Sequence, residues 1–120
     1  MDVTRRAHAA FNSGDVDALL TSVSPEVVWE DHGGFPDLAE LYRGHDGVRQ
    51  WYRDAIDAAW ENFGVEILGM RDAGGGRLIQ DVRITGTARS TGMQAERRLS
   101  HTIRVVDGLI VHRDSHPVEE

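Results

Sequence analysis

The sequence contains no cysteine, no lysine and only three prolines. Without cysteine the chain can form neither disulfides nor thiolate metal sites. No apolar run approaches the ~20 residues that a membrane-spanning helix requires, so we expect no membrane partner. The 13 basic residues are all arginine and are outnumbered by 20 acidic residues, which gives a formal net charge of −7. Because an acidic surface repels phosphate backbones, we also expect no nucleic-acid partner.

What is present is an ordinary globular composition. The 120 residues are 40% hydrophobic and 28% charged, which suits a single domain over residues 1–120 with a substantial core. Met1 leads directly into polar residues rather than into an apolar targeting segment. Together with the lack of cysteine, these features predict a cytoplasmic protein.

Helical periodicity dominates the first half of the chain. The apolar spacing predicts a helix over 3–12, and Asp15 is a suitable N-cap for a short second helix. Residues 33–44 are rich in Gly, Pro and Asp, which predicts a loop with a helical turn around 38–42.

The clearest helix is predicted over 46–61. Its apolar residues recur at i, i+3, i+4, i+7 and i+8, which forms one continuous stripe along the helix. Trp51 and Trp60 both lie on this stripe and are expected to pack in the core.

From residue 63 the pattern changes to period two, which is typical of strands. Strands are predicted over 27–32, 63–71, 77–90, 93–106 and 109–116. Helices followed by a long antiparallel meander indicate an α+β fold. One sheet of this length, with about three helices to cover it, should curl around them and leave a cavity in the hollow.

The turn at 106–108 sets the register of the last two strands. As a three-residue hairpin loop with a glycine bulge, it places His101 opposite Arg113. A two-residue Asp-Gly turn, our second interpretation, would place His101 opposite Asp114.

The strand over 27–32 carries the first candidate functional residue. Alternation puts Trp29 and Asp31 on one face, which otherwise looks buried, and His32 on the other. Apolar surroundings disfavour a charged carboxyl group and can raise its pKa toward the range useful for proton transfer. Asp31 is therefore a candidate acid or base; the alternative is a strand-end aspartate that caps the glycine loop or pairs with an arginine.

The order of these elements and several motifs resembles the nuclear-transport-factor-2-like superfamily, in its SnoaL-like and ketosteroid-isomerase-like branch. The resemblance covers about residues 5–116 and is carried by the segments 10–20, 25–29, 42–48, 86–92 and 101–111. It implies a cone-shaped fold, in which a curved mixed sheet wraps around the helices, with a ligand pocket at the open end and frequent dimerisation through the sheet. The superfamily includes isomerases, cyclases, hydrolases, dehydratases and proteins without catalytic activity, so the resemblance does not specify a reaction.

The resemblance also assigns roles to individual residues. Asp31 falls where ketosteroid isomerases carry their general base, and His101 falls where they carry an aspartic acid that donates to the oxyanion. Their second oxyanion donor is a tyrosine in the first helix, and this chain has Ala7 there. That departure argues against steroid isomerisation.

Arg113 is the third candidate catalytic residue. By alternation it points into the hollow, where burying an unpaired guanidinium costs several kcal/mol. It should therefore pair with Asp31, bind an anionic ligand through a carboxylate or enolate oxygen, or reach the mouth of the cone. Pairing with Asp31 would lower the pKa of that acid and make it a poor base at rest.

The remaining histidines do not predict a metal centre. His112 and His116 lie four residues apart on one strand, a separation of about 13 Å, which is too long for two ligands of one ion. We therefore expect neither a metal nor another cofactor. Both histidines share the outer face of the sheet with Asp114, which makes this face a candidate homodimer surface.

Two functions are compatible with these features. The first is a small cofactor-independent enzyme that acts on a hydrophobic, carbonyl-bearing molecule through Asp31, His101 and Arg113. The second is a non-catalytic module that binds a small ligand or a partner protein in the same hollow. In both, the predicted ligand-binding wall consists of Phe11, Trp29, Tyr42, Trp51, Val82 and Ile103. Substituting Asp31 by asparagine should separate the two, because an enzyme would lose on the order of 10² in rate.

Overall fold

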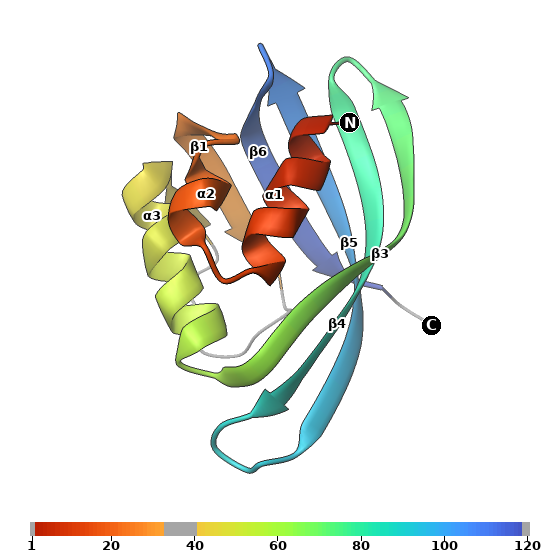
Figure 1. Ribbon diagram of the computed structural model, residues 1–120. Coiled ribbons are helices and arrows are strands. Elements are labelled where there is room, and N and C mark those ends of the chain that lie inside the picture. Colours follow the sequence, from red (N-terminus) through yellow and green to blue (C-terminus); the bar gives the residue numbers. More distant parts are fainter. Residues whose placement is uncertain (1, 33–40, 119–120) are drawn as a thin grey trace.

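The computed structural model of the chain describes residues 2–32 and 41–118. They form one curved six-stranded sheet whose concave face is covered by helices (Figure 1). This is the α+β fold that the sequence predicts. The helices are α1 (Asp2–Asn12), α2 (Val16–Leu20) and α3 (Gly44–Trp51), and α3 continues as the π-helix η1 (Tyr52–Asp57). The strands are β1 (Val23–Asp31), β2 (Leu41–Arg43), β3 (Trp60–Gly74), β4 (Arg77–Ala88), β5 (Gln94–Val106) and β6 (Leu109–Pro117).

The strand order is β2-β1-β6-β5-β4-β3, so the first strand joins the last. The β1–β6 pair is parallel and the other pairs are antiparallel, which makes the sheet mixed as expected. Parallel pairing of β1 with β6 matters for function, because it brings residues near position 30 beside residues near position 114.

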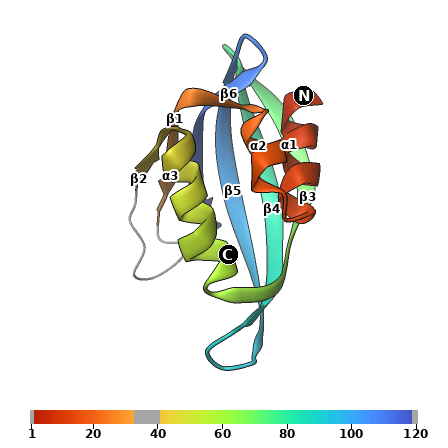
Figure 2. The same ribbon diagram turned by 60° about the vertical axis from the view of Figure 1, so that its left-hand side comes forward.

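The N-terminal helices follow the sequence pattern closely. Asp15 caps α2 as predicted: its side chain accepts a hydrogen bond of 3.0 Å from the backbone N–H of Ala18. The two helices lie side by side over the concave face (Figure 2).

The helix predicted over 46–61 is shorter and less regular than expected. The α-helix ends at Trp51 and a π-helical turn follows, while Trp60 begins β3. Packing against the sheet explains this end, because the ring of Trp60 fits where Gly86 has no side chain. A Cβ at Gly86 would lie 3.0 Å from the Trp60 ring. Tertiary contact therefore overrides the helical periodicity.

The prediction of a helical turn around 38–42 is wrong for Tyr42, the last residue of that range. Residues 33–40 lie outside the described part of the chain, but Tyr42 belongs to the strand β2. Tyr42 pairs with Trp29 across the β1–β2 ladder and is buried. This pairing draws the segment into extended geometry.

The turn between β5 and β6 has two residues, not the three that we ranked first. Val106 pairs with Leu109, and the backbone φ angles of Asp107 and Gly108 are 52° and 76°. Two consecutive positive φ angles are what a type I′ hairpin turn requires.

A bulge then changes the register again, so neither predicted pairing of His101 is correct. Val105 pairs with Ile110 but Arg104 pairs with His112, which leaves Val111 as the extra residue. His101 consequently lies opposite Ser115. The bulge keeps His101 and Arg113 on the same concave face, and the sequence pattern alone does not reveal it.

Two apolar clusters fill the hollow of the sheet. The larger one joins the helices to β1 and β6, and the smaller one is Val82, Ile84 and Leu99 with neighbours on β3. Phe63 contacts both clusters.

Candidate functional site

A cavity lies between the two apolar clusters. Its empty space, the open mouth and adjoining solvent included, is about 700 Å³. Most of its lining is apolar, and the polar exceptions are few: Thr4, His8, Gln80, His101 and Arg113.

Five of the six predicted wall residues line this cavity: Phe11, Trp29, Trp51, Val82 and Ile103. Tyr42 does not. It is buried next to α3, where Gly47 leaves room for it, because a Cβ on that glycine would lie 3.1 Å from the Tyr42 backbone. Tyr42 therefore belongs to the core behind the cavity rather than to its wall.

Asp31 and Arg113 form a buried ion pair at the inner end of the cavity. The Nη1 atom of Arg113 donates to Asp31 Oδ1 at 2.7 Å and to the backbone oxygen of Glu30 at 3.1 Å. Asp31 and Arg113 are only 4% and 5% exposed. Parallel pairing of β1 and β6 creates this contact, since Arg113 lies beside Trp29 and Ser115 beside Asp31.

The second oxygen of Asp31 is also occupied. The indole N–H of Trp51 donates to Asp31 Oδ2 at 2.5 Å. Both carboxylate oxygens thus accept hydrogen bonds. Asp31 is not one of the described residues that line the cavity. Of the roles considered from the sequence, the structure places Asp31 as the partner of Arg113; a role as general base stays a prediction.

The guanidinium of Arg113 lies against two indole rings that also contact each other. Its Cζ atom lies 4.7 Å from the ring centroid of Trp29 and 5.1 Å from that of Trp51. Cation–π contacts on desolvated rings stabilise a buried cation, which adds to the ion pair. These contacts fix the orientation of a group that lines the cavity.

His101 lies beside Arg113 and is neutral. Burial lowers the pKa of His101 well below its ordinary value of 6.5, and the positive charge of Arg113 lowers it further. The Nη2 atom of Arg113 lies 3.4 Å from His101 Nε2. Because a guanidinium can only donate, Nε2 is the acceptor and the ring proton resides on Nδ1.

Two further polar groups at this end have unused hydrogen-bonding capacity. Within the described part of the chain, Trp29 Nε1 and Ser115 Oγ are buried without a hydrogen-bond partner. Buried polar groups are normally paired, so such groups near a cavity suggest contact with something bound there. Sequence analysis did not single out Ser115, because its position opposite His101 depends on the bulge.

The polar end of the cavity is therefore rich in donors. Arg113 and His101 line the cavity, and the guanidinium and the Nδ1–H of His101 are hydrogen-bond donors, while the carboxylate that balances the charge belongs to Asp31, outside the lining. Donors fixed in apolar surroundings are suited to binding a carbonyl oxygen or to stabilising an oxyanion.

None of the described helices is long and apolar enough to cross a membrane.

Comparison with solved structures shows the same fold in proteins of low sequence identity. An NTF2-like protein of unknown function from Burkholderia pseudomallei is 22% identical, with a TM-score of 0.87 over 98% of this chain and 89% of that chain. A Catenulispora acidiphila protein with a ketosteroid isomerase-like fold, crystallised with trimethylamine, is 17% identical, with a TM-score of 0.82 over 95% of this chain and 83% of its own.

A third solved structure also contains a small molecule. This Mycobacterium tuberculosis protein, in complex with estradiol-17β-hemisuccinate, is 17% identical, with a TM-score of 0.80 over 95% of this chain and 89% of that chain. A search of curated proteins finds no match.

The sequence comparison covers nearly the whole chain. Residues 4–113 match the SnoaL-like domain, a range that includes Asp31, His101 and Arg113. The resemblance noted from the sequence is thereby confirmed: the chain belongs to the SnoaL-like domain family and has the NTF2-like, ketosteroid isomerase-like fold.

Proposed function

We propose that this protein binds a small hydrophobic molecule that carries a carbonyl oxygen. The observation that carries the proposal is Arg113, a buried guanidinium that lines an otherwise apolar cavity and is held in place by Asp31. The ligand's apolar body contacts the aromatic and aliphatic wall, and its oxygen accepts hydrogen bonds from Arg113 and His101.

A neutral acceptor fits this end better than a free carboxylate. The charge of Arg113 is already balanced by Asp31, 2.7 Å away, so an added anion would meet a neutral pair rather than a free cation. The polar groups that remain available are donors, which match a carbonyl oxygen.

The ligands of structural neighbours support the apolar part of this proposal. The Mycobacterium tuberculosis protein was crystallised with a steroid ester, which shows that one protein of this fold holds a large hydrophobic molecule. In the present chain the corresponding space is the cavity of about 700 Å³.

The test uses two probes of matched shape. 2-Acetylnaphthalene has a carbonyl oxygen where 2-isopropenylnaphthalene has a CH₂ group, and quenching of Trp29 and Trp51 fluorescence reports binding of either. We expect the ketone to bind about tenfold more tightly, the amount that a hydrogen bond from a charged donor contributes.

Variants then test whether the preference for the ketone comes from Arg113 and its partner Asp31. The double variant Asp31→Asn/Arg113→Gln keeps the pair neutral, and it should reduce the preference for the ketone to less than about threefold. Arg83→Gln, which removes an exposed arginine paired with Glu66, is the matched control and should leave the preference unchanged. Equal affinity of the wild-type protein for both probes would refute the proposal.

Proton transfer on the bound ligand is the second candidate function. It is favoured by the convergence of Asp31, His101 and Arg113, which come from three different strands. In this function Arg113 and His101 stabilise the enolate oxygen while Asp31 removes a proton from the neighbouring carbon. Asp31 must first release the hydrogen bond from Trp51 to reach the ligand.

Deuterium exchange distinguishes the two functions. An enzyme of this kind accelerates exchange of the methyl protons of 2-acetylnaphthalene in heavy water, as followed by NMR. Asp31→Asn should then lower the exchange rate by about 10² or more, whereas Trp51→Phe, which frees Asp31 Oδ2, should not lower it. No acceleration by the wild-type protein would leave binding as the function.

The oligomeric state and the cellular location that we expect from the sequence are also proposals. We propose a homodimer formed through the outer face of the sheet, in a cytoplasmic protein. Support for the dimer is the set of titratable side chains on that face, to which His112, Asp114 and His116 contribute.

A further inference from the structure

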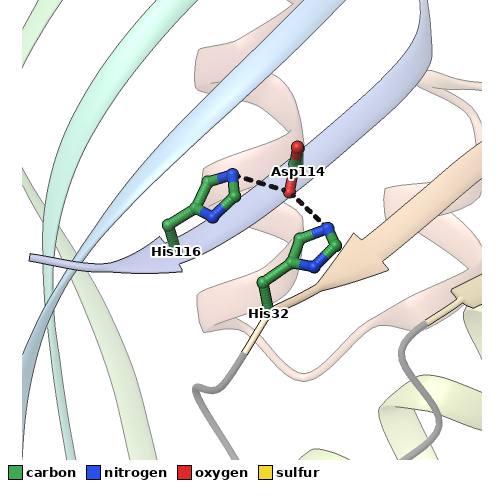
Figure 3. A group of neighbouring side chains, drawn as sticks. All are labelled: His32, Asp114 and His116. Atoms are coloured by element: carbon green, nitrogen blue, oxygen red, sulfur yellow. Dashed lines mark ion pairs between the residues drawn. The ribbon is translucent and has the colours of Figure 1, made fainter.

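A group of histidine and aspartate side chains occupies the convex face of the sheet, away from the cavity. His32 comes at the end of β1, and Asp114 and His116 come from the neighbouring strand β6. Figure 3 shows both imidazole rings directed at the carboxylate of Asp114. None of these three residues contributes to the cavity lining.

This arrangement differs from what the sequence predicted. The sequence pairs His112 with His116 on one strand, and the distance of about 13 Å between them argues against a common ion. The structure instead brings His116 next to His32, which is 84 positions away, through the parallel pairing of β1 with β6. Sequence spacing cannot show a ligand set that is assembled across two strands.

The distances within the group are those of ligands around one ion. His32 Nε2 and His116 Nε2 each lie 3.1 Å from Asp114 Oδ1. Two ligand atoms bound at about 2.1 Å to one zinc ion, at angles of 90–110°, lie about 3.0–3.4 Å apart. The candidate ligand atoms of the three residues all fall within 4.8 Å of one another, and one of the two stacked rings must turn out of the stack before both nitrogens point at one ion.

Hydrogen bonding does not account for these contacts. Asp114 Oδ1 is buried, and among the described residues it has no hydrogen-bond partner; its contacts with the two imidazoles are ion pairs, which require protonated rings. The two rings are also stacked, 4.9 Å apart with an angle of 10° between their planes. An oxygen that lies 3.1 Å from two imidazole nitrogens without bonding to either is placed as a metal ligand would be.

We propose that His32, Asp114 and His116 bind one divalent transition-metal ion of the zinc type. Two imidazole nitrogens and one carboxylate oxygen are a common ligand set for such ions, with water or a further ligand in the remaining position. In the single chain the side chains of His32 and His116 are 38% and 50% exposed, so an ion can reach the site before two chains associate through this face.

A second overlapping set is less suitable. Glu30, His112 and Asp114 are also close enough to share an ion. However, Glu30 and His112 already pair with each other at 2.6 Å, and this set offers only one imidazole. They flank the proposed site: Glu30 Oε1 lies 4.0 Å from His32 Nε2, the nitrogen assigned to the ion, and places a further negative charge beside the site.

Calorimetric titration of the untagged full chain with Zn²⁺, after removal of metals by EDTA, tests the proposal. We expect one ion per chain, and weaker binding by about tenfold or more in His116→Ala and in His32→Asn. His116 is exposed, so its removal should leave the fold intact, which circular dichroism verifies. Co²⁺ should give visible absorption bands that both variants lose.

Two control variants make the outcome specific. His45→Gln removes another histidine but keeps a donor for its hydrogen bond to Val23, and it should bind Zn²⁺ like the wild type. His112→Gln should retain binding within about threefold, since it lies outside the proposed set. Wild-type binding no tighter than that of His116→Ala, or loss of binding in His112→Gln rather than in His116→Ala, would overturn the proposal.

Discussion

At the scale of single residues, the ion pair of Asp31 and Arg113 is the feature on which the site depends. Its two members are buried, and each has additional hydrogen bonds or aromatic contacts that hold it. Removing only one member of such a pair leaves an uncompensated charge in the protein interior, which is far more costly than replacing both.

Stability measurements can test this coupling. Arg113→Met should lower the free energy of unfolding by about 3–5 kcal/mol, because Asp31 remains buried without its partner. The double variant Asp31→Leu/Arg113→Met should recover most of that loss in urea denaturation. Arg83→Met, an exposed control, should hardly move the denaturation midpoint. Equal losses in the single and double variants would contradict the coupling.

His101 predicts a specific dependence of stability on pH. Its pKa in the folded protein lies well below the ordinary value of 6.5, so the unfolded chain binds a proton that the folded chain does not. The stabilisation from the neutral form is therefore complete above that value and is lost as pH falls below it. The slope for one such group is at most about 1.4 kcal/mol per pH unit.

The measurement compares the wild type with His101→Gln at several pH values. As pH falls from about 7 to 5, the wild type should lose more free energy of unfolding than His101→Gln does. The other histidines are present in both proteins and cancel in this comparison. A difference that does not change with pH would mean that His101 is not held neutral.

At the scale of elements, sequence patterns were reliable where local rules decide and failed where distant packing decides. The cap at Asp15 and the alternation of β4 are local and were predicted. The end of α3, by contrast, depends on how Trp60 fits against Gly86, and the bulge at Val111 depends on how β6 aligns with β5.

The candidate site shows the same division. Alternation predicts that Asp31 and Arg113 occupy the inner face, but His101 shares that face with Arg113 only through the bulge at Val111, which the sequence pattern does not reveal. The indole N–H that occupies Asp31 and the exclusion of Tyr42 from the cavity depend on the positions of α3 and β2, which the sequence does not provide.

The N-cap of α2 offers a prediction at this scale. α2 has only five residues, and the Asp15 side chain accepts a hydrogen bond from the Ala18 N–H. Asp15→Ala should cost about 1 kcal/mol of stability in urea denaturation. Asp15→Asn keeps the acceptor oxygen and should cost much less, so equal losses in both variants would show that the cap is not the cause.

At the scale of the whole molecule, the two faces of the sheet have separate tasks. The concave face, with the helices, encloses the cavity, and the convex face carries the titratable cluster around Asp114. The same β1–β6 pairing builds both, because alternate residues of these strands point to opposite faces.

The proposed dimer is tested by molar mass. Light scattering at pH 7.5 should give twice the 13.3 kDa of the chain, because we expect association through the outer face. A monomeric mass would remove the dimer from the account. Repeating the measurement with EDTA shows whether the metal ion contributes to association.

The central claim is that neutral His101, next to Arg113, forms the ligand-binding end of the cavity, and nitrogen NMR of the imidazole rings tests it most directly. The account predicts that His101 keeps its proton on Nδ1 and stays neutral as the pH falls through its ordinary pKa of 6.5. It also predicts that 2-acetylnaphthalene shifts the His101 signals and leaves those of His32, His112 and His116 unchanged. A His101 that titrates near 6.5, or whose signals do not respond to the ketone, would contradict it.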